Sequence, residues 1–346
     1  MLNDGRLGFR LRLEDLVALT FFVLTLSIRL LVQGLRSVEI SPADVLIIIP
    51  SVALLLAKEI VHYFVAEGRR PASGEEPGIR EFVHPYWEII RDWFPFLVIL
   101  MMYYSLWGDA THLLITHDRD AELMALDQRL FGFQACLALQ RIVSPPLTSW
   151  MELAYGFHVL NIPIVACFIY LRRSRERFRE MMAGVLVITF FGLLGYLLVP
   201  AIGPIYTLRN QFTVPLSQPL EVVTRQIDFL DFARIKRDVF PSLHAGISFV
   251  VWLYAYRNSR RLFWILAPLI LSLWVSTVYL RYHYLIDVVA GLALAPLCYL
   301  LANWLFKRWG EIPVSLTLPR GWAGTLDRWG LAARPTGTSG KANDRP

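Results

Sequence analysis

Long apolar runs recur along this chain of 346 residues and restrict its fold more than any other feature of the sequence. Each is long enough, or nearly so, to cross a hydrocarbon core of about 30 Å as a helix. Eight such runs lie near residues 15–34, 44–65, 86–106, 149–171, 181–200, 242–256, 262–280 and 284–306. Because lipid offers backbone groups no water to bond, each run is expected to be helical. The sequence predicts an all-α polytopic membrane helix bundle with about eight transmembrane helices.

The composition agrees with a membrane protein, since only 18% of the residues are charged and the mean hydropathy is +0.47. A soluble domain carries about a quarter charged residues. These values exclude a disordered chain, a secreted disulfide scaffold and a nucleic-acid-binding arm. Cys136, Cys167 and Cys298 have no paired spacing, and no Cys/His cluster suggests zinc. We expect no metal, no cofactor and no nucleic-acid partner, and the oligomeric state is left open.

The positions of basic residues indicate how the chain is oriented in the membrane. Clusters of arginine and lysine precede the first run and follow the second, fourth, sixth and eighth runs. Eight spans would put all of these clusters on one side, which should be the cytoplasm, together with both termini. We expect an integral protein of the bacterial plasma membrane. Its predicted parts are N-terminal membrane helices (1–100), a membrane core (101–306) and a flexible cytoplasmic tail (307–346).

Two long segments would then face outside, 107–148 and 201–241. The first includes residues 121–143, whose apolar spacing predicts a helix on the membrane surface. The second contains basic residues, among them Arg209 and Arg237, on the side where the positive-inside rule predicts few. They suggest an anionic ligand on the outer face, with a solvated loop as the alternative for each.

One candidate site lies where Pro241, Ser242, His244 and Gly246 open the short run 242–256. Proline suits the first position of a helix. Ser242 and His244 then fall in the first turn, where free N–H groups and the helix dipole favour an anion. A histidine at the end of a span is otherwise an interfacial or packing residue.

A second candidate site opens the run 284–306, where His283 and Asp287 are four residues apart and share one helical face. An aspartate inside an apolar run costs several kcal/mol unless it is paired, so it is a functional candidate. Asp287 could accept a hydrogen bond from one ring nitrogen of His283 and leave the other as a nucleophile or base. The alternative is a pair that only stabilises the helix end.

The ends of these runs meet the same face of the membrane, so the two histidines, the aspartate and several arginines can converge there. This set suits phosphoryl transfer without a metal. One histidine attacks phosphorus, and the other protonates the leaving oxygen and later activates the acceptor. Arginines and helix-start N–H groups stabilise the phosphate charge. His158, with Tyr155, could line the same pocket or pack at the interface.

These motifs resemble the type 2 phosphatidic acid phosphatase superfamily. Residues 241–246 are similar to its second signature, Pro-Ser-x-His-x-Gly, and His283-x-x-x-Asp287 to the end of its third. The resemblance covers roughly residues 100–305. It implies that His283 is the nucleophile, that Asp287 activates it and that His244 is the general acid.

The sequence departs from that family at two places. Ser276 and Thr277 stand where the third signature has Ser-Arg. The first signature, a Lys followed by Arg-Pro, has no match. The departures resemble a branch that includes the fungal inositol phosphorylceramide synthase, which also tends to carry an Asp-x-x-Leu-Phe-Gly-like stretch, here residues 127–132. The phosphate-binding candidates are Ser242, Gly246, Arg209, Arg237 and Arg281, and which arginine replaces the missing one is left open.

The resemblance implies an integral membrane enzyme that acts on a lipid phosphate ester at the outer leaflet through a phosphohistidine. It would be a phosphatase if water is the acceptor, or an inositol-phosphate-type phosphotransferase if a polyol or lipid hydroxyl is. A membrane lipid transporter or scramblase is the alternative from another class, since intramembrane charges are common there. No inverted repeat supports it. A catalytically silent lipid-phosphate-binding member is a third reading, which the intact histidines and aspartate disfavour.

Overall fold

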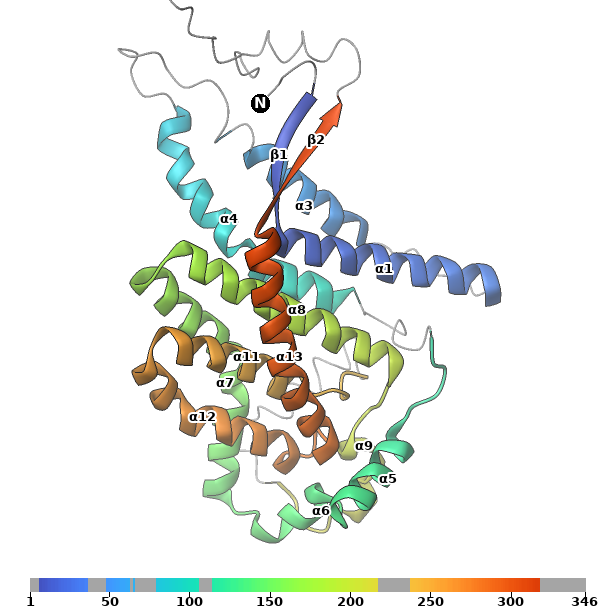
Figure 1. The fold of residues 1–346 in the computed structure, drawn as a ribbon. Coiled ribbons are helices and arrows are strands. Elements are labelled where there is room, and N and C mark those ends of the chain that lie inside the picture. Colours follow the sequence, from blue (N-terminus) through green and yellow to red (C-terminus); the bar gives the residue numbers. More distant parts are fainter. Residues whose placement is uncertain are drawn as a thin grey trace, which may run out of the picture. The chain divides into compact units, whose positions relative to one another are not determined.

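The computed structural model describes residues 6–36, 48–62, 65, 79–105, 114–216 and 237–317. Most of them are helical, as predicted (Figure 1). The helices are α1 (Leu13–Arg36), α3 (Ile48–His62), α4 (Ile79–Tyr104), α5 (Asp120–Phe131), α6 (Ala135–Leu139), α7 (Pro145–Arg172), α8 (Arg175–Leu198), α9 (Pro204–Thr207), α11 (Leu243–Asn258), α12 (Arg260–Tyr279) and α13 (Leu285–Trp309). Two 3₁₀ turns, η3 (Gln140–Ile142) and η4 (Arg209–Gln211), and two strands, β1 (Arg6–Arg12) and β2 (Glu311–Thr317), complete the described elements.

Five helices of the described part are long and apolar enough to cross a membrane, namely α1 over Leu13–Val32, α7, α8, α12 and α13. The predicted count of about eight is not confirmed. Helix α3 has 15 residues and α11 has 16, fewer than the roughly 20 that a span needs. Helix α4 has 26 residues, but charged side chains interrupt its apolar sequence. A short apolar helix also fits a position buried among other helices, and α11 has such a position.

The chain divides into two compact units, one of residues 1–12, 53–94 and 310–346 and one of residues 13–52 and 95–309. In the first unit, β1 and β2 pair antiparallel, with Arg6 opposite Thr317. Strand β2 lies in the segment 307–346, for which the sequence predicts a flexible cytoplasmic tail, and that assignment stays a prediction. Its hydrogen-bonding partner comes from the other end of the chain, which local sequence patterns do not reveal. Residues beyond 317 lie outside the described part.

Charged side chains in the first unit pair with one another. Arg91 lies 2.7 Å from Glu59, Lys58 lies 3.1 Å from Glu59, and Arg12 lies 2.9 Å from Asp92. None of these side chains is more than 5% exposed. A buried ion costs several kcal/mol unless it is paired. Mutual pairing therefore lets these charges remain within α3, α4 and the end of β1.

Helix α11 is central in the second unit, where it packs against α7, α8, α12 and α13 (Figure 1). Buried residues occur all around it, among them Leu243, Ala245, Val250 and Tyr254. A helix enclosed on every side needs no polar face. Helices α5 and α6 contribute Leu123 and other apolar residues to a core cluster shared with the starts of α11 and α13.

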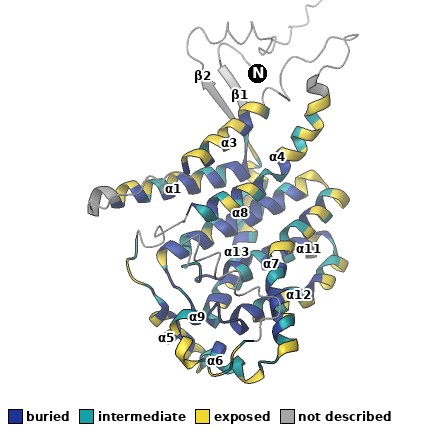
Figure 2. Cartoon of the chain, turned by 180° about the vertical axis from the view of Figure 1, so that it is seen from behind, coloured by how far each residue is buried: buried dark blue, intermediate teal, exposed yellow. Residues whose placement is uncertain are grey.

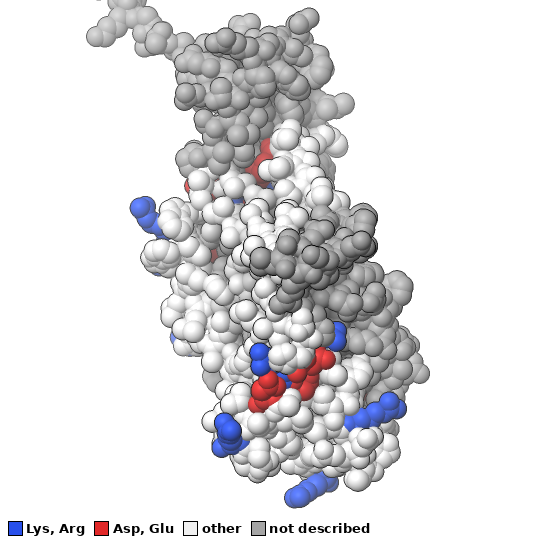
Figure 3. Space-filling view, turned by 90° about the vertical axis from the view of Figure 1, so that its right-hand side faces the viewer, with Lys and Arg blue, Asp and Glu red and all other residues white. Residues whose placement is uncertain are grey.

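The surface of this unit is apolar where a soluble protein would be polar. Leu160, Ile265 and Leu300 are 54%, 71% and 63% exposed, and exposed residues follow the outer sides of the helices (Figure 2). On the face in Figure 3, most described residues are uncharged, and acidic and basic side chains gather in the lower part of the view. This distribution fits helices surrounded by lipid, with a polar end.

Glycines allow α8 and α13 to approach the first turn of α11. A Cβ on Gly291 would lie 2.3 Å from the carbonyl oxygen of Ser242, and one on Gly192 would lie 2.2 Å from a methyl of Leu243. A real Cβ cannot occupy either position without movement of its neighbours. The absence of a side chain at these positions thus sets where the turn with Ser242 and His244 lies.

We expect Gly291→Ala to lower the stability of the protein by about 1–3 kcal/mol, because the added methyl group overpacks a contact with backbone. The matched control is Gly156→Ala in α7, where a Cβ would meet nothing within 4 Å. Thermal unfolding of the purified protein in detergent measures both. Equal melting temperatures for the two variants would contradict the packing.

Candidate active site

The turn between α12 and α13 positions His283. The N–H groups of Tyr282 and His283 both donate to the carbonyl of Thr277, at 3.0 and 3.1 Å. Arg281 adopts φ 71°, a left-handed conformation that only a few per cent of non-glycine residues adopt. This reversal ends α12 and directs the next residues back toward the bundle, so that His283 is only 2% exposed.

Asp287 lies in the first turn of α13 and is fully buried. Its Oδ2 accepts a hydrogen bond from the N–H of Tyr284 at 2.8 Å, which is the reach-back bond of a capping box. The same oxygen lies 3.4 Å from Nδ1 of His283. Asp287 therefore stabilises the helix start and faces the ring of His283, as the sequence predicts.

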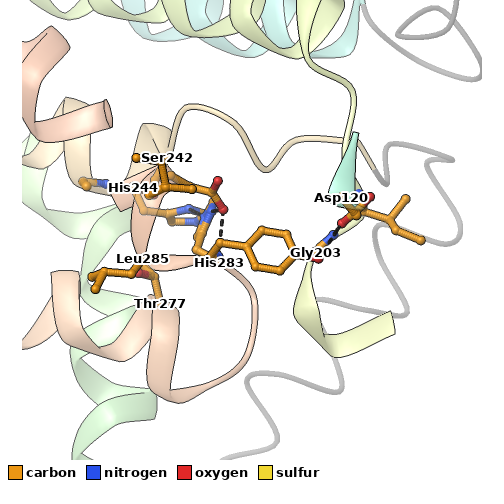
Figure 4. A network of polar contacts seen from close by, with 12 residues as sticks. Asp120, Gly203, Ser242, His244, Thr277, His283 and Leu285 are labelled. Atoms are coloured by element: carbon orange, nitrogen blue, oxygen red, sulfur yellow. Dashed lines mark hydrogen bonds and ion pairs between the residues drawn. The ribbon is translucent and has the colours of Figure 1, made fainter. Parts of the chain in front are cut away.

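His244 comes from the first turn of α11, after the N-cap Ser242. The N–H of Ser242 donates to the carbonyl of Asp287 at 3.0 Å, which joins the starts of α11 and α13. Nδ1 of His244 lies 3.3 Å from Nε2 of His283. Figure 4 shows Ser242, His244 and His283 converging. The two histidines that are 39 positions apart in the sequence are thus neighbours in space.

Burial lowers the pKa of His283 to about 4, although the nearby carboxylate of Asp238 and a backbone contact with Val239 oppose the shift. At neutral pH the ring is therefore uncharged. Nδ1 lies 3.4 Å from Asp287 and Nε2 lies 3.3 Å from His244, so a proton on Nδ1 would leave the lone pair of Nε2 directed toward His244. A neutral imidazole with an oriented lone pair can act as a nucleophile.

Helix α5 holds the loops around the site through two carboxylates. Asp127 accepts from the N–H groups of Leu285 and Ile286, at 3.0 and 2.8 Å, and so caps α13. Asp120 accepts from Ile202 and Gly203, at 3.0 and 2.8 Å. Figure 4 shows Asp120 beside Gly203, away from the histidines. Segment 121–143 is largely helical, but it is divided at Gly132 into α5, α6 and the turn η3, and its position on the membrane surface stays a prediction. Asp120 and Asp127 of α5 bind backbone around His283.

Gly203 lets the end of α8 approach the same turn. Its φ is +88°, and a Cβ there would lie 2.5 Å from the carbonyl oxygen of Tyr282. The hydroxyl of Tyr284 donates to Asp120 at 2.8 Å and contacts Thr207 at 2.7 Å. The Gly-Pro sequence after α8 therefore packs against the turn that carries His283, in addition to ending the helix.

These motifs and their spacing agree with a comparison of the whole sequence. A profile described as PAP2 superfamily matches residues 121–301, more than half of the chain. The chain belongs to the PAP2 superfamily. The match confirms the resemblance seen in the sequence, and it includes His244, His283 and Asp287.

This PAP2 protein also has a curated relative in Bacteroides thetaiotaomicron, a phosphoinositol dihydroceramide synthase. The two are 25% identical over 189 residues, which are 50% of this chain and 59% of the relative. The matched part therefore spans less than two thirds of the relative's length. The similarity agrees with the predicted branch. No solved structure matches the chain.

The three arginines predicted to bind phosphate have different surroundings in the structure. Arg281 donates to the carbonyl of Val214, and its guanidinium lies 4.0 Å from the centre of the Phe212 ring. Arg237 pairs with Asp118 at 2.7 Å. Arg209 is exposed on η4. Among the described residues, none of the three arginines bonds to His244 or His283, so their role as phosphate ligands stays a prediction.

The two other predicted phosphate ligands have roles in the framework. The hydroxyl of Ser242 accepts from Ala245 N–H at 3.4 Å as the N-cap of α11. Gly246 packs against α13, where a Cβ would lie 3.3 Å from the carbonyl oxygen of Gly291. Among the described residues, no group of three or more His, Cys, Asp or Glu could hold a metal ion.

The structure adds residues that the sequence motifs do not single out. Asp238 accepts a hydrogen bond from the hydroxyl of Tyr103, and burial raises the pKa of Asp238. It lies close enough to His283 to interact with it electrostatically. Its sequence signal is an acidic residue directly after the basic pair Lys236-Arg237, just before the second signature. Tyr155 and His158, for which the sequence left two readings, both contact His244.

We expect Asp127→Ala to destabilise the protein by about 0.5–2 kcal/mol, because two N–H groups at the start of α13 lose their acceptor. Glu122→Ala on the same helix is the control, since Glu122 is exposed and forms an ion pair with Arg119 three residues earlier. Thermal unfolding in detergent separates the two. A wild-type melting temperature for Asp127→Ala would show that the cap contributes nothing.

Proposed function

We propose that this PAP2 protein is an integral membrane enzyme that cleaves or transfers the phosphate group of a lipid phosphate ester through a phosphohistidine. The observation that carries the proposal is the position of His283, between the carboxylate of Asp287 at 3.4 Å and the ring of His244 at 3.3 Å. A histidine oriented by a carboxylate and facing a second proton-exchanging group has the parts that covalent catalysis needs.

In the first step, Nε2 of His283 attacks phosphorus and an N–P bond forms. The bond from phosphorus to the lipid oxygen breaks, and His244 protonates that oxygen. The two rings contact each other directly in the structure, so the phosphate must enter between them. Asp287 keeps the proton on Nδ1 of His283 and balances the charge that the ring acquires.

In the second step, an acceptor hydroxyl attacks the phosphohistidine, His244 takes its proton, and the N–P bond breaks. Water as acceptor gives a phosphatase, and a polyol or lipid hydroxyl gives a phosphotransferase. The relative named as a phosphoinositol dihydroceramide synthase favours head-group transfer. Neither step uses a metal ion.

The phosphate group itself needs positive charge near it. Arg209, Arg237 and Arg281 remain the proposed sources, with the N–H groups at the start of α11. Arg237 and Arg281 would exchange their present partners, Asp118 and Val214, for phosphate oxygens. Clusters of basic residues between the apolar runs support an orientation with both termini in the cytoplasm of a bacterium and the site on the outer side.

The decisive experiment follows labelled phosphorus from phosphatidic acid and from phosphatidylinositol with the full chain in detergent. Wild type should release phosphate or label an added polyol or ceramide. His283→Ala should lose roughly 10³-fold or more of the rate, because the nucleophile is gone. His117→Ala, an exposed histidine outside the site, should match wild type.

An active His283→Ala variant would overturn the mechanism. If wild type moves labelled lipid between leaflets of vesicles but makes no new phosphorus compound, the transporter or scramblase alternative holds instead.

As the pH falls, kcat/KM should decrease with a midpoint near pH 4 rather than near 6.5, the ordinary pKa of histidine, because burial lowers the pKa of His283 to about 4. Below this pH the lone pair of Nε2 carries a proton and cannot attack phosphorus. Rates measured at low substrate across the acid range test this. A midpoint near pH 6.5 would show that His283 is not the buried neutral nucleophile.

A further inference from the structure

A tyrosine from α7 contacts the ring nitrogen of His244 that faces away from His283. The hydroxyl of Tyr155 lies 3.1 Å from Nε2 of His244, and the two ring centres are 4.9 Å apart. Tyr155 is fully buried. No signature residue explains this contact, because α7 lies outside both signatures.

The ring of Tyr155 is held from several sides. It stacks on Tyr282 with centres 5.0 Å apart and planes 18° apart. His158 lies one turn further along α7, where its Nδ1 contacts the carbonyl of Tyr155 at 2.8 Å and its ring meets His244 edge-on at 4.5 Å. A ring packed in this way leaves its hydroxyl little freedom to move from Nε2.

Asp287, His283, His244 and Tyr155 form one continuous series of contacts, at 3.4, 3.3 and 3.1 Å. In this series each imidazole uses one ring nitrogen to contact the residue before it and the other to contact the residue after it. His244 therefore has Nε2 committed to a hydroxyl and Nδ1 directed to the reacting centre beside His283. A tyrosine hydroxyl can donate or accept, so it can bond Nε2 in either protonation state of the ring.

We propose that Tyr155 is a positioning residue for His244: its hydroxyl holds Nε2, so that Nδ1 is the nitrogen that exchanges a proton with the leaving and accepting oxygens. This inference rests on the proposed function. In its acid form His244 carries a proton on each ring nitrogen. When the lipid oxygen departs, the Nδ1–H bond breaks and an O–H bond forms, while Nε2–H stays bonded to the oxygen of Tyr155 and the ring becomes neutral. When the acceptor attacks, its O–H bond breaks and Nδ1–H forms again.

The backbone of His244 is held separately, which makes the role of Tyr155 specific to the ring. The hydroxyl of Ser248 donates to the carbonyl of His244 at 2.6 Å, and the indole N–H of Trp274 donates to Ser248 at 2.8 Å. Removal of the Tyr155 hydroxyl therefore leaves these backbone contacts in place. What it removes is the polar partner of Nε2.

The test is Tyr155→Phe, which keeps the ring and its stacking. It is assayed on two phosphate esters, one with an alcohol leaving group and one with p-nitrophenolate. An alcohol needs a proton from His244 in order to leave, and p-nitrophenolate does not. The rate compared is that of the first turnover, in which the phosphohistidine forms. We expect this rate to fall about tenfold or more on the alcohol ester, while the first turnover of the nitrophenyl ester stays nearly as fast as in wild type because its leaving group needs no proton.

Tyr254→Phe is the matched control, because this tyrosine of α11 is also buried and its hydroxyl bonds Asn303 at 3.2 Å. It should leave both esters at the wild-type rate. In a His244→Ala background, Tyr155→Phe should cause no further loss, since the residue acts through His244. This second measurement separates positioning from damage to the fold.

Equal losses on the two esters, or a further loss in the His244→Ala background, would overturn the role of Tyr155. So would wild-type rates for Tyr155→Phe on both esters. If wild-type protein turns over neither ester, the proposed function fails first, and the two failures are therefore distinguishable.

Discussion

The buried carboxylate of Asp287 holds the site together. Its side chain accepts from Tyr284 N–H and faces His283, and its backbone carbonyl accepts from Ser242 N–H. One residue thus ends the turn after α12, starts α13 and fixes the start of α11 beside it. A carboxylate removed from water is tolerated only with such partners. The partners that make it tolerable are the ones that orient the two histidines.

The same chemistry recurs at a distance from the histidines. Asp127 and Asp120 reach from α5 to backbone N–H groups that have no partner within their own helix or turn. Because the N–H groups of Leu285 and Ile286 already bond Asp127, an anion at the start of α13 would compete with a carboxylate. The start of α11 is left as the better place for a phosphate, next to the proposed nucleophile.

Much of the site follows from the sequence because its parts are local. His283 and Asp287 are one helical turn apart, and Ser242 caps the helix that carries His244, so spacing alone predicts their neighbours. Spacing does not predict what an arginine meets. Arg281 contacts a loop carbonyl and an aromatic ring, and Arg237 pairs with Asp118. Hydropathy likewise does not distinguish α11, enclosed by four helices, from a lipid-facing span.

The sequence alone predicts a helical membrane protein and the candidate histidines and aspartate, because these depend on apolar length and on contacts within one helical turn. The PAP2 family was first suggested by the likeness of two motifs to known signatures, and the match over residues 121–301 shows it. Tertiary structure decided that Nε2 of His283 faces His244, that Tyr155 reaches the far side of that ring, and that α5 caps α13. Each of these contacts joins residues at least 39 positions apart. Only packing of the helices brings such residues within hydrogen-bond distance.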